Sequence, residues 1–180
     1  MRNAFECGLY LIELFQKTNL KCGTTKVQKL LVISQVASLI KRKKVLFEND
    51  IVFQLCGFGV QGLDFSYEIC GFIENDTLLF ARSVKSNLES ERNSKYFLYN
   101  GKVFIDSDEQ EILCDVFDRF GSFKARTLGD LLSEWTIHSD SNLNVISPDI
   151  ISSWVTAGMP CKDKKDNLLT GYLKELESSD

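Results

Sequence analysis

The stretch from Leu30 to Ile40, with the sequence LLVISQVASLI, would carry apolar side chains on nearly every side of a helix. Such a helix belongs in the interior of a fold, because a surface helix keeps one polar face toward water. Thr25 and Gln28 precede this stretch at the spacing of a capping box. We therefore expect a central helix over 25–43 that begins at this cap and organises the core.

The bulk composition is typical of a globular chain, with 180 residues, 44% of them hydrophobic and 26% charged. A chain of this length buries about 70% of its unfolded surface, so its core needs no disulfides or metal ions for stability. The net charge of −4 argues against a general nucleic-acid surface. No apolar run approaches the ~18 residues of a membrane span, and residues 1–16 lack a signal-peptide pattern. These features predict a cytoplasmic protein without membrane contact.

Six cysteines are spread through the chain, and no two have the close spacing of a zinc knuckle or a redox CxxC motif. Most have apolar neighbours in the sequence, and a buried free cysteine behaves as a small hydrophobic residue. We expect reduced structural thiols, no metal site and no cofactor.

The spacing of hydrophobic residues divides the chain into three parts. Apolar residues at helical spacing predict a first helix over 3–17, ahead of the central helix. A β-rich insert over 50–105 follows, and helices return over 107–158. We expect an α+β fold, a mostly helical single domain over 1–160 with a small antiparallel β-sheet inserted in the middle, and a C-terminal helix or tail over 161–180.

Local signals predict how the β-rich insert pairs. Residues 51–56 read as a buried strand, and residues 65–70 alternate as a strand does. Residues 77–81 follow a turn and can pair back across it. Asn100 and Gly101 lie between two β-rich runs, which predicts a tight hairpin because both turn positions need positive φ.

Helix-boundary signals recur in the last part of the chain. Residues 107–110 (SDEQ) have capping-box spacing, and Gly121 suits the left-handed residue that follows a helix. Pro148 suits a first helical position. A last amphipathic helix is expected within 166–176.

Residues 57–62 (GFGVQG) match the G-x-G-x-x-G motif and follow a predicted strand. A dinucleotide-binding fold requires a helix to open at this point, whereas residues 63–73 alternate like a strand. The motifs that accompany a kinase glycine-rich loop do not follow either. We interpret the segment as a glycine-rich bend between a strand and a turn.

His138 is the only histidine of the chain, so it cannot build a multi-histidine metal site. A dyad with a cysteine or a serine would make an enzyme, but the sequence selects no partner for it. A structural histidine that bonds a loop carbonyl is the favoured interpretation.

The basic run from Lys41 to Lys44 ends the predicted central helix. Four positive charges could contact phosphates, which leaves a nucleic-acid-binding regulator as an alternative function. A solvated helix end is favoured, because positive charge in a last turn complements the helix dipole and no aromatic platform accompanies the run.

Several short motifs occur in a particular order along the chain. They are 26–31 (KVQKLL), 57–60 (GFGV), 108–113 (DEQEIL), 119–121 (RFG) and 132–136 (LSEWT). In this order the chain resembles the Panacea domain family, the SocA-like antitoxins common in bacteria, phages and prophages. The family pattern has a Lys-x-Gln-Lys-Leu-Leu helix, a central Tyr-Gly-Pro-Val-like core and a later Leu-Ser-x-x-Thr-His element.

The resemblance implies a phage- or prophage-associated, non-enzymatic antitoxin that neutralises a toxin or another effector protein by direct contact or by delivery to a protease. It transfers no catalytic residue, and the two motif lysines at the start of the central helix are expected to face water. The family-motif residues, interpreted as scaffold, are Lys26, Gln28, Lys29, Gly57, Gly59 and His138.

Partner specificity is expected in the β-rich insert, which lies between the family blocks and is rich in aromatic residues. Aromatic side chains are effective anchors of protein interfaces. The residues expected to bind the partner protein are Phe58, Tyr67, Phe72, Tyr96 and Tyr99.

Overall fold

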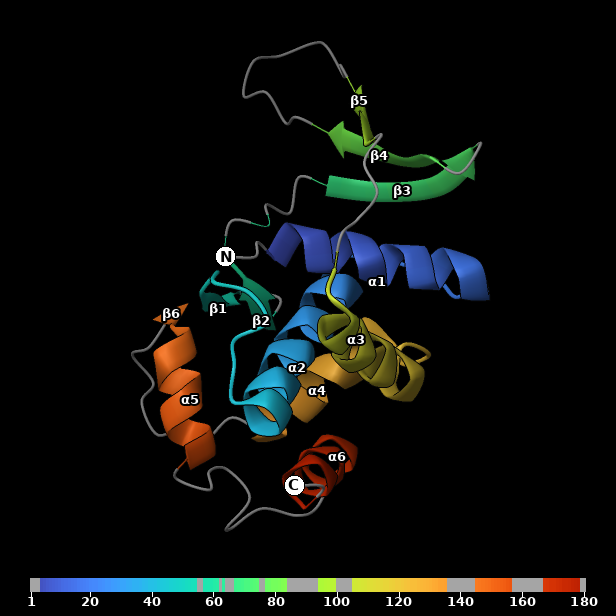
Figure 1. Cartoon of the computed structure of the whole chain (residues 1–180). Helices are drawn as coiled ribbons and strands as arrows, with labels where there is room; N and C mark the ends of the chain where they lie inside the picture. Colours follow the sequence, from blue (N-terminus) through green and yellow to red (C-terminus); the bar gives the residue numbers. More distant parts are fainter. Residues whose placement is uncertain are drawn as a thin grey trace.

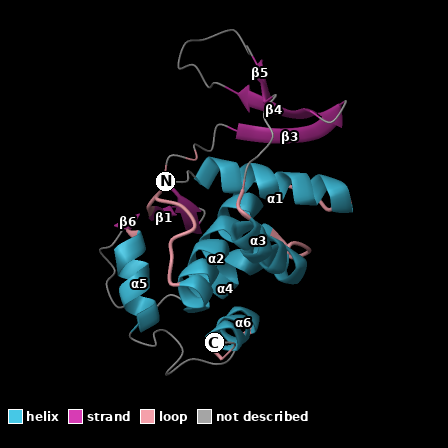
Figure 2. Cartoon of the chain, viewed as in Figure 1, coloured by secondary structure: helices cyan, strands magenta, loops and turns pink. Residues whose placement is uncertain are grey.

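The computed structural model describes residues 4–54, 57–61, 63, 67–74, 77–83, 94–99, 105–135, 145–156 and 167–178. The helices are α1 (Ala4–Thr18), α2 (Thr24–Arg42), α3 (Ser107–Phe120), α4 (Ala125–Trp135), α5 (Pro148–Thr156) and α6 (Leu168–Glu177). The strands are β1 (Ile51–Gln54), β2 (Gly57–Val60), β3 (Tyr67–Glu74), β4 (Thr77–Ser83), β5 (Ser94–Tyr99) and β6 (Val145–Ile146). The α+β fold class is confirmed, with helices that form the body and short antiparallel sheets (Figure 2).

Helix α2 is the centre of the fold, and it contacts each of the other five described helices (Figure 1). Every residue from Leu30 to Ile40 is at most 5% exposed, as the apolar sequence predicted. Around this helix the core is closed by aromatic contacts, such as the edge-to-face pair of Phe15 in α1 and Phe117 in α3, whose ring centroids lie 4.8 Å apart.

The small antiparallel β-structure expected in the middle of the chain, a sheet or hairpins, forms two separate antiparallel sheets. The first has the strand order β2-β1-β6 and packs against α2 through β2. The second has the order β3-β4-β5; β3 contacts α1 and α2, and β5 forms the far edge (Figure 1). β1 is paired with both a neighbouring strand and the distant β6, which ties the middle of the chain to residues 145–146.

The polar side chains of α2 hold the backbone that leaves the helix. Gln35 bonds the backbone of Leu46 and Phe47, and the Ser38 hydroxyl donates to the Lys44 carbonyl at 2.8 Å. Gln28 accepts from the Val60 N–H at 2.6 Å and donates to the Leu63 carbonyl at 2.9 Å. Buried amides and hydroxyls need such partners, so these residues fix the path of the chain into β1 and β2.

The predicted start of α2 is wrong in two respects. The helix begins at Thr24 with Gly23 as its N-cap, so Thr25 does not cap it, and the side chain of Gln28 bonds the β2 region instead. Lys26 and Lys29 do not face water, since they are only 9% and 2% exposed. The sequence pattern could not reveal this because residues distant in the sequence cover the first turns of the helix.

Other helix boundaries shift by one residue or change conformation. The second capping box involves Asp106 and Glu109 rather than 107–110, with the Glu109 carboxylate accepting from the Asp106 N–H at 3.3 Å. Gly121 ends α3 in the right-handed region, with φ −61°, and not in the left-handed one. Pro148 is the first residue of α5, as expected.

The C-terminal helix belongs to the same body as the other helices. Leu169, Tyr172, Leu173 and Leu176 of α6 are part of the single buried core, and the helix contacts α2 and α4. The boundary drawn after residue 160 therefore does not separate α6 from the domain.

In the β-rich insert, β3 and β4 pair as an antiparallel hairpin, with β4 over 77–83 where pairing was expected. The predicted Asn100-Gly101 turn lies outside the described residues. The preceding run forms β5, which pairs with β4.

Candidate functional site

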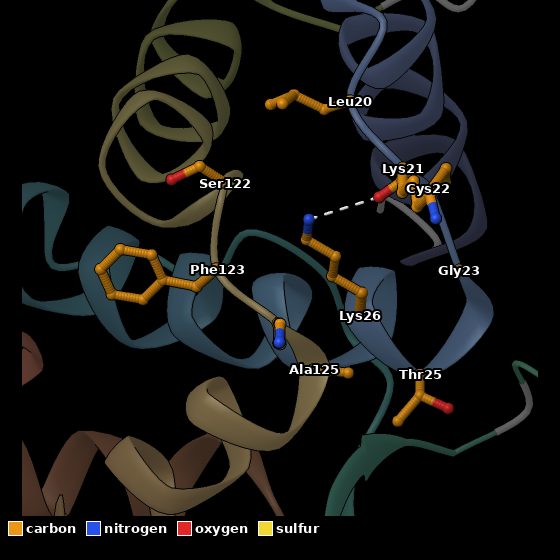
Figure 3. A pocket seen from close by; sticks show the side chains of 10 residues that line it. Leu20, Lys21, Cys22, Gly23, Thr25, Lys26, Ser122, Phe123 and Ala125 are labelled. Carbon is orange, nitrogen blue, oxygen red and sulfur yellow. Dashed lines mark hydrogen bonds between the residues drawn. The ribbon is translucent and has the colours of Figure 1, made fainter.

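A cavity of about 630 Å³ opens where two loops meet, between α1 and α2 on one side and between α3 and α4 on the other (Figure 3). Its lining residues come from both loops and from the first turns of α2 and α4. They are Leu20, Lys21, Cys22, Gly23, Thr25, Lys26, Ser122, Phe123, Lys124 and Ala125. The size falls within the range of small-molecule sites.

Local chain reversals place these two loops together. α1 ends at Thr18, whose hydroxyl donates to the Leu14 carbonyl at 2.9 Å, and Asn19 follows with φ 55°. Asparagine tolerates this left-handed conformation better than most residues. On the other side, the Phe123 N–H donates to the Phe120 carbonyl at 3.0 Å, which turns the chain from α3 into α4.

Lys26 is the most buried charged residue of the cavity. Its Nζ donates to the Lys21 carbonyl at 3.3 Å (Figure 3). It also lies 4.7 Å from the centroid of the Phe15 ring. Within the described part of the chain no carboxylate pairs with this ammonium group. Burial lowers the pKa of Lys26 below its usual value, opposed by the neighbouring Cys22.

Cys22 lies beside Lys26 in the wall of the cavity. Burial raises the pKa of its thiol to about 11, although Lys26 and the backbone of Gly23 act in the opposite direction. A thiol with this pKa stays protonated at neutral pH and is a poor nucleophile. The pair is therefore not arranged for cysteine catalysis.

The cavity is electropositive. Its lining contains three lysines and no acidic residue. Neither α2 nor α4 carries an acidic residue in its first turn, and Gly23 caps α2 without a side-chain acceptor. Helix N-termini carry a partial positive charge and amide groups without intrahelical partners, so both helices add to the field of Lys21, Lys26 and Lys124.

The other family-motif residues have scaffold positions next to this region. Gln28 holds the end of β2, and Lys29 lies enclosed between β2 and α4. A Cβ placed on Gly57 would lie 3.1 Å from the Lys29 Nζ, and one on Gly129 would lie 3.3 Å from it. Gly59 pairs with Val52 inside the first sheet. His138 lies outside the residues that the structure describes.

One of the five residues expected to bind a partner lies in the core and not on a surface. Phe58 lies in β2, is only 7% exposed and belongs to the core, so it offers no contact surface. The other four lie in the second sheet. The register places Tyr67 and Tyr99 on one face, opposite Arg82 and Leu78, and Phe72 and Tyr96 on the other, opposite Leu79 and Ala81.

The basic run at the end of α2 is partly neutralised. Lys41 forms an ion pair of 2.6 Å with Glu111 of α3, and the Lys43 amine donates to the Ile40 carbonyl at 2.6 Å. The ion pair offsets one of the four charges that the run could offer to phosphates, while the bond of Lys43 to a carbonyl leaves its charge unchanged.

The cavity was not identified from the sequence, which pointed to Lys26 but not to Leu20, Cys22, Phe123 or Lys124. A signal is present in retrospect. Both loops carry a lysine and lead into a helix without an acid in its first turn, where acids are favoured.

Neither a metal nor a membrane is indicated by the described residues. No group of three or more potential ligands among them lies close enough to hold a metal ion. Within the same residues no helix has the length and apolar character needed to cross a membrane. The thiols of Cys7, Cys22 and Cys114 are not in disulfides.

Comparison of the chain with protein-family models, with curated proteins and with solved structures finds no significant match.

Proposed function

We propose that this protein is a cytoplasmic, non-enzymatic inhibitor of the antitoxin class, which neutralises one partner protein by direct contact through its second sheet, β3-β4-β5. The proposal combines the ordered motif resemblance with the position of this sheet. The second sheet lies on the far side of α1 from the first sheet and from α4, α5 and α6 (Figure 1).

The observation that carries the proposal is the distribution of aromatic and aliphatic residues over both faces of the second sheet. The register puts Phe80 and Phe97 opposite each other on one face and Leu79 and Leu98 opposite each other on the other. A three-stranded sheet that packs on a core with one face normally has polar residues on the second. A sheet that is apolar on both faces has surface to bury against a partner.

Strand β5 adds a second possible mode of contact. It is the edge of the sheet farthest from α1, and no described strand pairs with its outer side. Such an edge can accept an extended segment of another protein by main-chain hydrogen bonds. Tyr96 and Tyr99 lie on this strand, on opposite faces.

Co-expression with the product of the neighbouring gene tests the proposal. We expect that product to be toxic alone, harmless with this protein, and co-purified with it. The double variant Tyr96→Ser/Tyr99→Ser should lose protection and co-purification, while its urea-unfolding curve shows that the helical body is still folded. A neighbouring product that is harmless alone and does not co-purify would contradict the proposal.

A matched control variant is available on the opposite side of the body. Leu168, the first residue of α6, is 65% exposed. Helix α6 lies on the opposite side of α1 from the second sheet (Figure 1). Leu168→Ser should retain full protection. If both variants lose protection equally, contact through the second sheet is excluded.

A further inference from the structure

We propose that the cavity between the two loops is a binding site for a small organic anion, whose phosphate or carboxylate group binds at Lys26 and whose apolar part lies against Leu20. This site is separate from the proposed protein contact, because none of its lining residues belongs to the second sheet.

The first argument is the environment of Lys26. The residue is only 9% exposed, and its amine has a single described hydrogen bond, to the Lys21 carbonyl at 3.3 Å. Removing an ammonium group from water is costly unless a counter-charge is nearby. The contact with the Phe15 ring compensates only in part. An anion in the adjacent cavity would supply the missing counter-charge.

The second argument is the charge of the whole cavity. Lys21 and Lys124 flank Lys26 from opposite loops, and the cavity has no acidic lining residue. The first turns of α2 and α4 both open at its wall, where their amides favour negative charge. The three lysines and the two helix N-termini all line one cavity, which distinguishes a site from a helix start with solvated lysines.

The third argument is the apolar part of the lining, which selects an organic anion over a bare inorganic ion. Leu20 is 37% exposed, so part of its side chain is available to a ligand in the cavity. Phe123 is held in place by an edge-to-face contact with Phe120, at 5.9 Å between ring centroids. The Phe123 ring points away from Lys26 in Figure 3, so Leu20 is the apolar side chain beside the charged part of the cavity. The volume of about 630 Å³ accommodates a molecule larger than phosphate.

Calorimetry on the purified full chain tests the site with four simple probes. Phenyl phosphate and benzoate carry the two candidate head groups, benzamide is the neutral counterpart, and benzylamine is the cationic one. We expect the two anions to bind and to raise Tm, and benzamide and benzylamine to do neither. Tighter binding of phenyl phosphate assigns a phosphate ligand, and tighter binding of benzoate assigns a carboxylate ligand.

Two lysine variants link the binding to this cavity. Lys26→Met should weaken the anions about tenfold or more, the loss expected for one charge-assisted hydrogen bond. Lys44→Met, which removes an exposed lysine at the other end of α2, should change affinity by less than about twofold, because salt screens distant charges. If Lys26→Met fails to fold, the exposed Lys124→Met serves in its place and should weaken binding about threefold.

Three results would overturn the site. The first is no heat and no Tm shift with either anion at millimolar concentration. The second is equal affinity for benzamide and benzoate, which would make the cavity merely apolar. The third is unchanged anion affinity in both Lys26→Met and Lys124→Met. None of these outcomes depends on a partner protein, so the site and the proposed function fail separately.

Discussion

The side-chain amide of Gln35 hydrogen-bonds both the N–H and the C=O of Phe47, as the backbone of a paired strand would. Its Nε2 donates to the Phe47 carbonyl at 2.8 Å, and its Oε1 accepts from the Phe47 N–H at 3.2 Å and from the Leu46 N–H at 2.8 Å. Gln35 is 0% exposed and sits in the middle of the central helix. A single amide therefore satisfies three buried backbone groups and directs the chain from α2 toward β1.

Replacing this amide should strongly destabilise the protein. In Gln35→Leu, three buried backbone groups lose their partner, and each unsatisfied group costs about 1–3 kcal/mol, so we expect a loss of at least about 3 kcal/mol. Urea unfolding measures the change. Gln61→Leu is the control, because the Gln61 side chain is exposed. This substitution should change the free energy of unfolding by less than about 0.5 kcal/mol. Comparable losses in the two variants would argue against the role of Gln35.

Two glycines that enclose Lys29 should differ in their response to alanine. Gly57 has φ +87°, so a Cβ there is strained as well as 3.1 Å from the Lys29 Nζ. Gly57→Ala should cost about 1–3 kcal/mol. Gly129 lies inside α4, where alanine gains about 1 kcal/mol of helix propensity against a contact at 3.3 Å. Gly129→Ala should be nearly neutral in the same unfolding assay, and an equal loss at both sites would refute this explanation.

Helix α6 should depend on the hydroxyl of Tyr172. It donates to the Asp115 carboxylate of α3 at 2.8 Å, and Arg119 lies 4.9 Å from the ring centroid. Tyr172→Phe removes the hydrogen bond and should cost about 1 kcal/mol, whereas Tyr172→Ala also leaves a cavity and should cost about 3–5 kcal/mol. Hydrogen exchange of the α6 amides should accelerate in the same order.

A nearby ion pair provides the control for this prediction. Arg119 and Glu175 are 2.8 Å apart, but the Glu175 side chain is 62% exposed. Glu175→Gln should cost less than about 0.5 kcal/mol because solvent screens the pair. A larger effect of Glu175→Gln than of Tyr172→Phe would mean that charge, rather than the buried hydroxyl, docks the helix.

The cavity should give the protein two opposed responses to alkaline pH. The pKa of the Cys22 thiol is about 11 in the folded state and 9.0 in the unfolded state. Between these pH values the unfolded state binds fewer protons, so the contribution of Cys22 to the free energy of unfolding falls as pH rises. Lys26 acts in the opposite sense. The pKa of Lys26 is lower in the folded state than the 10.5 of the unfolded state. Between the folded pKa and 10.5 the unfolded state binds more protons, so the contribution of Lys26 to the free energy of unfolding rises with pH.

Unfolding titrations across the alkaline range separate the two groups. The stability of the wild type relative to Cys22→Ala should decrease as pH rises, whereas its stability relative to Lys26→Met should increase. At neutral pH, Lys26→Met should change the free energy of unfolding by less than about 1 kcal/mol. The variant loses the cation–π contact with Phe15, which destabilises it, but no longer buries a charged group, which stabilises it. Parallel curves for all three proteins would show that neither group titrates differently in the folded state.

The sequence was most informative where the physics is local. The buried body of α2, the first helix and the pairing of β3 with β4 follow from hydrophobic periodicity, because each element needs one consistent pattern over neighbouring residues. Pro148 at the start of α5 was likewise predictable, since its fixed φ and missing N–H suit that position.

The sequence failed where distant segments cover an element. Gln28 has the spacing of a cap, but its side chain bonds the Val60 N–H in β2 and the Leu63 carbonyl after it. Lys26 looks solvated in the sequence, whereas in the structure the loops on either side enclose it. Phe58 shows the same limit, because β2 turns it into the core and not toward a partner.

By itself, then, the sequence determined the central helix and the mixed α+β character, since periodicity and turn chemistry act between near neighbours. Only the tertiary structure decided that the start of α2 forms the wall of an electropositive cavity and that α6 closes the core. Both depend on segments about a hundred residues apart in the chain, such as Lys26 and Lys124, and on burial that no local pattern encodes.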